Sequence, residues 1–150
     1  MKRFLSFAFG CFLSYSAHAA TYPVDDSASV VLSPLIQMKW DQIAPNGQNQ
    51  NLMRGQTDVL VRLNTRPFQS KVGRVFIVLN NQALGRVRAT WQTNGVLFAG
   101  TVRSGERALV YSGPVTQSVI EDTMHLTIET NGSQLERDQQ LQFSFEVDID

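Results

Sequence analysis

Two kinds of residue that support chemistry, cysteine and histidine, are scarce in this chain of 150 residues. The one cysteine, Cys11, lies near the N-terminus, and beyond residue 19 the one histidine is His125. After residue 19, one histidine and no cysteine remain, and these cannot supply a tetrahedral zinc site. No serine stands in a Gly-x-Ser-x-Gly turn, and no glycine-rich phosphate loop leads into a helix. We therefore expect neither an enzyme nor a cofactor or metal, and we interpret His125 as a solvated strand residue.

Charge of one sign is not in excess, since 13 basic residues stand against 13 acidic ones. This balance gives no reason to expect nucleic acid as a partner. Long apolar runs are also missing after the N-terminus, and none approaches the roughly 20 residues that a membrane-spanning helix needs. These absences favour a binding or structural role for a single domain.

The first 19 residues resemble a secretory signal. Lys2 and Arg3 precede an apolar run from Phe4 to Tyr15, and Ala17-His18-Ala19 places small residues where a signal peptidase reads them. We expect cleavage after Ala19, which would remove Cys11. The mature chain would then enter an oxidising compartment with no disulfide to stabilise its fold.

Nearly every patterned segment after residue 34 alternates with period two, which is the spacing of half-buried strands. Apolar residues on both faces of Arg74–Asn80 indicate a central strand, and Asn94-Gly95 predicts a tight hairpin. No convincing helix is present. The expected strands are Leu35–Trp40, Asp58–Asn64, Arg74–Asn80, Arg86–Gln92, Val96–Val102, Arg107–Ser112, Thr123–Thr130 and Leu141–Ile149. Such regular short strands predict an all-β fold, an immunoglobulin-like antiparallel β-sandwich.

Charge is distributed unevenly along the chain. Residues 54–107 carry nine basic and two acidic residues, whereas residues 108–150 carry eight acidic and one basic. Basic and acidic strands that pair across the surface would explain this pattern. The alternatives are contact between subunits, or a ligand patch at Arg86 and Arg88 for an acidic sugar. Trp40 and Trp91 lie on apolar strand faces, and we expect both in the core, with a sugar-stacking role as the alternative.

The segment from residue 20 to residue 34 forms a separate unit. Ala28, Val30 and Leu32 alternate with Ser27, Ser29 and Val31, and Ser33-Pro34 then interrupts the run. This pattern predicts a strand that ends abruptly and can be presented away from the domain of residues 35–150.

A cysteine-free, exported sandwich with such an extension resembles the subunits of chaperone–usher surface fibres, and it is most similar to thin atypical fimbriae of the Saf type. The similarity extends over the mature chain and is carried by three segments: Ala28–Pro34 followed by a strand with Trp40, Asp122–Ile128, and the closing strand Leu141–Ile149. The chain lacks the aromatic C-terminal signature and the disulfide of rod-forming pilins, which favours the thin-fibre branch.

The resemblance implies a sandwich lacking one strand, which a neighbouring subunit donates. Such an exchange is a form of β-augmentation, in which an extended segment adds a strand to the open edge of a sheet. The resemblance also implies a periplasmic chaperone, an outer-membrane usher, other fimbrial subunits and a host receptor as partners, and display at the cell surface. The implied donor residues are Val24, Ala28, Val30 and Leu32, and the implied acceptor groove follows Leu141, Phe143, Phe145, Val147 and Ile149.

A different function is also compatible with these residues. The chain would then be a free-standing secreted or periplasmic sandwich that binds a carbohydrate or a protein. Residues 24–33 would form its own first strand, and the sandwich would be complete without a neighbour.

Overall fold

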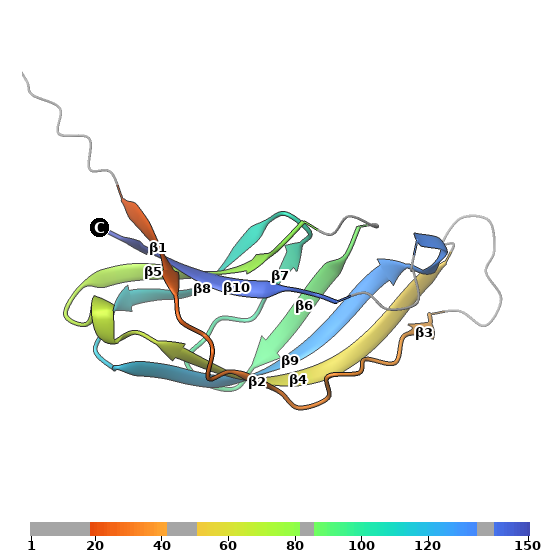
Figure 1. Ribbon diagram of the computed structural model, residues 1–150, viewed down its shortest axis with the longest axis horizontal. Coiled ribbons are helices and arrows are strands. Elements are labelled where there is room, and N and C mark those ends of the chain that lie inside the picture. Colours follow the sequence, from red (N-terminus) through yellow and green to blue (C-terminus); the bar gives the residue numbers. More distant parts are fainter. Residues whose placement is uncertain (1–18, 42–50, 82–85, 135–139) are drawn as a thin grey trace, which may run out of the picture.

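The structure is a computed structural model that describes residues 19–41, 51–81, 86–134 and 140–150. Its regular structure consists of β-strands and two short 3₁₀ turns, Arg66–Phe68 and Gly132–Gln134. The strands form two antiparallel sheets that pack face to face, so the predicted all-β sandwich is confirmed (Figure 1).

The smaller sheet, sheet A, contains the first and the last strand of the chain side by side. Its order is β1-β10-β5-β8. The strands are β1 (Ala20–Val24), β10 (Phe143–Ile149), β5 (Val72–Leu79) and β8 (Arg107–Pro114). β5 lies between β10 and β8, which confirms the central strand predicted from its two-sided apolar pattern.

The larger sheet, sheet B, is built around the two longest strands. Its order is β2-β4-β9-β6-β7, and β3 also pairs with β4. The strands are β2 (Val30–Val31), β3 (Lys39–Trp40), β4 (Leu52–Asn64), β9 (Val119–Asn131), β6 (Arg88–Thr93) and β7 (Gly100–Arg103). In Figure 1, β4 and β9 run side by side and extend beyond the end of sheet A.

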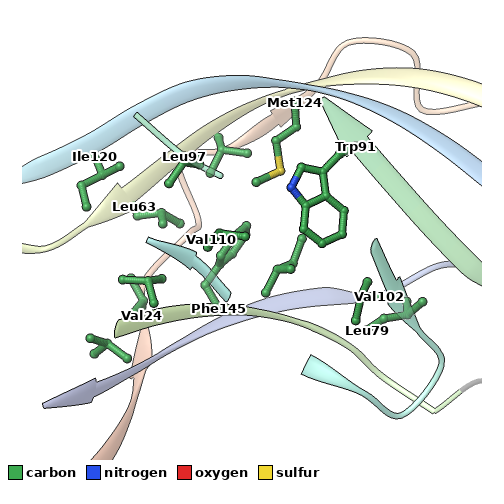
Figure 2. Packing of buried hydrophobic residues seen from close by; sticks show 14 of the residues in the cluster. Val24, Leu63, Leu79, Trp91, Leu97, Val102, Val110, Ile120, Met124 and Phe145 are labelled. Atoms are coloured by element: carbon green, nitrogen blue, oxygen red, sulfur yellow. The ribbon is translucent and has the colours of Figure 1, made fainter. Parts of the chain in front are cut away.

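Alternating apolar side chains from both sheets fill the space between them. Trp91 is fully buried beside Met124, and its indole N–H donates to the carbonyl of Phe98 at 2.8 Å (Figure 2). At another place in the same cluster, Val24 of β1 lies near Phe145 of β10. The core prediction for Trp91 is therefore confirmed, and β1 contributes to the core through Val24.

The hairpin expected at Asn94-Gly95 is wrong in detail. β6 and β7 do pair, but Trp91 stands opposite Gly100, so the connection is longer than a two-residue turn. Leu97 is drawn into the core, and its backbone N–H donates to the Asp122 carboxylate at 2.9 Å. Burial of this leucine outweighs the local turn preference.

The strand expected at Leu35–Trp40 is reduced to two residues, and Trp40 is 52% exposed instead of buried. Ile36 and Met38 of this segment pack against the core from the edge of β4. Gly55 of β4 permits this approach, because a Cβ there would overlap Ile36 and Met38. The segment therefore packs against the core mainly through Ile36 and Met38, and only two of its residues pair in the sheet. Trp40 lies at the edge of the core, half-exposed.

Candidate functional site

The edge of sheet A formed by β1 and β10 is the candidate functional site. β1 pairs antiparallel with β10 in a register that runs from Ala20 opposite Ile149 to Val24 opposite Phe145. The strand beside the last strand is thus the chain's own residues 20–24. Pro23 suits this position, because a proline cannot donate to a further strand and is tolerated at a sheet edge.

The inward face of β1 makes few apolar contacts. Val24 is buried to 6% exposure, whereas Tyr22 is 44% exposed and packs its ring 6.0 Å from that of Phe68. Ala20 is exposed. A strand that buries one apolar side chain has low local stability and can detach without opening the rest of the core.

The outward face of the same edge carries a polar network around Asp148. The Thr21 hydroxyl donates to Asp148 Oδ1 at 2.6 Å, and the Arg107 guanidinium contacts both carboxylate oxygens at 3.2 and 3.3 Å. The hydrogen bond from Thr21, helped by Arg107 and Arg74, lowers the pKa of Asp148 against the opposing effect of burial. The network joins β1, β10 and β8, and it fixes the register of β1.

Arg107 is itself held over an aromatic ring. Its guanidinium carbon lies 4.2 Å from the centroid of the Phe76 ring, and one of its nitrogens lies 3.7 Å from Glu146. Arg74 pairs with Asp150 at 3.6 Å on the same face. These contacts orient Arg107 toward Asp148.

A short irregular link joins β1 to sheet B. Asp25 forms an isolated bridge with Asn64, and Ser27 and Ala28 form an exposed turn. Hydrogen bonds from Ser27 lower the pKa of Asp25. Ser29 then caps the edge of β4, since its hydroxyl accepts from the Arg62 N–H at 2.9 Å. Residues 25–29 carry the chain from β1 in sheet A to β2 in sheet B and bury no apolar side chain. Such a link can act as a hinge between the two strands.

The four residues proposed as donors are not brought together. Val24 is in the core beside β10, whereas Val30 and Leu32 are 49% and 59% exposed and lie along the edge of β4. Ala28 is in the exposed turn. The inward positions opposite β10 are instead Ala20, Tyr22 and Val24. Their alternation before Asp25-Asp26 is the signal in the sequence that marks this short strand.

Four of the five residues proposed for the C-terminal strand lie on one face of β10, and Leu141 precedes the strand, which begins at Phe143. Phe145, Val147 and Ile149 are buried and stand opposite β1, and Leu141 and Phe143 are partly buried against the same core. Thr21, Asp148 and Arg107 were not foreseen, because nothing in the spacing of these three residues indicates that they converge.

The uneven charge along the chain is paired across neighbouring strands. Arg62 contacts Glu121 at 2.8 Å, and Glu129 contacts Arg54 at 2.7 Å and Arg88 at 3.6 Å. Arg86 is exposed, and among the described residues its side chain has no ion pair. The cross-strand explanation therefore accounts for much of the charge, and Arg88 of the candidate ligand patch is partly engaged by Glu129.

The polar strand face that contains His125 is solvated, as predicted. The His125 side chain is 47% exposed, and its Nδ1 lies 2.7 Å from an Asp58 carboxylate oxygen on the neighbouring strand. Within the described ranges, no group of three or more His, Cys, Asp or Glu side chains is arranged to hold a metal ion. No helix in that part of the chain is long and apolar enough to cross a membrane.

Comparisons with known proteins found no relative of this chain. No family model, no curated protein and no solved structure matches the chain.

Proposed function

We propose that this protein is a structural subunit of a surface fimbria whose copies assemble by exchanging the first strand. The pairing of β1 with β10 carries the proposal. In the family that the sequence resembles, a neighbour's N-terminal extension lies beside the C-terminal strand. The same contact made between two chains would use the same backbone partners and the same Val24 site.

Exchange requires that β1 can leave its own sheet at little cost. β1 contributes one buried apolar side chain, and it is followed by the exposed turn at Ser27 and Ala28. A strand swapped head to tail, from each copy to the next, produces an open filament when the rotation between successive copies does not close into a ring. An internal subunit of a fibre needs this property.

Assembly by this route requires accessory proteins, a chaperone and an usher. Without β1, the edge of β10 would expose unpaired backbone groups and the contact site of Val24, which favours aggregation. A periplasmic chaperone would cover that edge before the usher at the outer membrane replaces it with the next subunit. The polymer would support adhesion at the cell surface, through contacts with other fimbrial subunits and a host receptor.

The second candidate function is a free-standing exported binding module for a carbohydrate or a protein. One observation favours it: β1 and β2 complete both sheets with the chain's own residues. The two functions differ in whether β1 pairs within one chain or between chains.

A disulfide test separates them, with Cys11→Ser as the background. Pro23 and Glu146 face each other across β1 and β10. The proline has no N–H to donate, so this position suits a non-hydrogen-bonded pair, whose Cα atoms lie about 4.5 Å apart, within disulfide range. One chain carrying Pro23→Cys is co-expressed with another carrying Glu146→Cys, and both are exported under oxidising conditions.

Strand exchange predicts a disulfide between the two different chains. Thr116→Cys co-expressed with Glu146→Cys is the collision control, because Thr116 is exposed and does not pair with β10. If the two single-cysteine chains stay unlinked while the double variant closes an internal disulfide, the exchange proposal is wrong and the free-standing module is supported.

A further inference from the structure

The outer face of sheet B carries a row of cations that the strand-exchange proposal does not use. One rung of the sheet crosses five strands in the order β3-β4-β9-β6-β7. Its successive residues are Lys39, Arg54, Glu129, Arg88 and Arg103. Four of the five side chains are cationic. Neighbouring strands lie about 4.8 Å apart, so the row spans roughly 19 Å.

The acidic groups near this row neutralise only its inner part. Glu129 lies between Arg54 and Arg88 and contacts both, and its side chain is 16% exposed. Asp41 contacts Arg54 at 3.1 Å. Lys39 and Arg103, at the two ends of the row, are exposed and have no ion pair within the described part of the chain. The row therefore keeps an excess of positive charge at both ends.

The next rung supplies neutral hydrogen-bonding groups on the same outer face. Gln56, Thr127, Thr90 and Thr101 stand opposite one another in that order. The hydroxyls of Thr90 and Thr101 are 3.1 Å apart. Hydroxyl and amide groups beside guanidinium groups match a ligand that presents sugar hydroxyls together with sulfate or carboxylate groups.

We propose that this face of sheet B binds a linear acidic polysaccharide, with its sulfate or carboxylate groups along the row from Lys39 to Arg103. An extended row of cations suits a line of anions. Arginine is suited to sulfate and carboxylate because its planar fork donates two hydrogen bonds at once. Nucleic acid is disfavoured, since the chain has a balanced charge and a pI near 6.7, whereas nucleic-acid-binding domains are usually strongly basic.

This proposal is independent of strand exchange. The row lies on β3, β4, β9, β6 and β7 of sheet B, whereas exchange involves β1 and β10 of sheet A. A single copy of the protein would bind, and so would a copy within a fibre.

The test measures binding of the purified full chain to immobilised heparin at several salt concentrations, with fully desulfated heparin as the neutral probe. The double variant Lys39→Ser/Arg103→Ser removes the two unpaired cations. Its matched control is Arg66→Ser/Lys71→Ser, which removes one arginine and one lysine, also exposed, at the opposite end of β4. Thermal melting checks that each variant is folded.

We expect Lys39→Ser/Arg103→Ser to weaken heparin binding about tenfold near 0.15 M salt, with a larger loss at lower salt because screening is weaker there. The control pair should bind as the parent does. Glu129→Gln removes the central negative charge while keeping the side-chain shape, and it should tighten binding several-fold.

Three results would overturn the proposal. The parent chain fails to bind heparin, or the two double variants lose affinity equally, which would mean non-specific attraction. The third is that duplex DNA or vesicles with anionic lipid bind as tightly as heparin and respond to the same variants.

Discussion

Asp148 is the residue on which the position of the first strand depends most directly. It is 6% exposed, yet it is charged, and its carboxylate accepts from Thr21 of β1 and from Arg107 of β8. A buried carboxylate is stable in the folded state only with such partners. Protonation of the Asp148 carboxylate should therefore weaken the pairing of β1 with β10.

The pH dependence has a definite sign. The hydrogen bond from Thr21 is the main cause of the lowered pKa of Asp148 in the folded protein, and a free aspartate has a pKa of about 3.9. Its contribution to stability is present above that value and is lost as the pH falls through the lowered folded pKa. Melting curves between pH 6 and pH 2.5 should show this loss.

Asp148→Asn tests the assignment to this residue. We expect the variant to be about 1–2 kcal/mol less stable than the parent at pH 6, and the difference should shrink on acidification. Thr21→Val is the partner control and should lose about 1 kcal/mol. A difference between parent and Asp148→Asn that stays constant down to pH 2.5 would contradict the role of the ionised carboxylate.

The two tryptophans are predicted to respond differently to the same change. Trp91→Phe removes the indole N–H that bonds to Phe98 and leaves space in the core, so we expect a loss of about 2–3 kcal/mol. Trp40→Phe changes a half-exposed ring, and the loss should stay below about 1 kcal/mol. Urea denaturation of both variants measures this, and equal losses would show that Trp40 is also a core residue.

At the level of elements, strands with one buried face could be predicted from the sequence. In β9 and β10 the apolar alternation is long, and the residues expected to face inward, such as Leu126, Ile128 and Phe145, are buried. The segment from residue 20 to residue 41 could not be placed in this way, because its pairing depends on contacts distant in sequence. Val24 meets β10 and Val30 meets β4, more than a hundred and about thirty residues away respectively.

The candidate site was foreseen in outline only. The alternation in the closing strand indicated its inward face, and the N-terminal segment was expected to pair beside the closing strand of a neighbouring copy. The polar network of Thr21, Asp148 and Arg107 is formed by three strands that meet only in the folded sheet. Its members have ordinary spacing and no motif, so no local pattern could reveal it.

The strand β1 as an element gives a prediction that compares two valines. Val24→Asp places a charge at a buried position beside Phe145, whereas Val30→Asp changes a half-exposed residue on β2. Burial of an unpaired charge is costly, so Val24→Asp should release β1 and abolish polymer formation, while Val30→Asp should reduce it much less. Hydrogen exchange of the β1 and β10 amides measures the release, and polymer content is measured by size-exclusion chromatography. Equal effects of the two variants would mean that the exchanged segment extends to β2.

Polymerisation through β1 would give the whole molecule a particular behaviour on a gel. After removal of the expected signal, no disulfide can join these chains, so any ladder of sizes must be non-covalent. Strand pairing of this kind should survive electrophoresis without SDS and be lost on boiling in SDS, because the main-chain hydrogen bonds and the Val24 contact are non-covalent and break when the sheet unfolds. The purified protein is loaded once unheated and once boiled, and we expect a ladder that collapses to one monomer band.

The double variant Pro23→Cys/Glu146→Cys supplies the control at this scale. In the copies whose disulfide closes internally, β1 is fixed to its own β10. These copies, separated by size from those linked between chains, should run as monomer only in the unheated lane. Addition of reductant should restore the ladder, because the strand is then free to pair with a neighbour. If the locked variant still forms the ladder, the copies associate through another surface, and the first strand belongs to its own domain throughout.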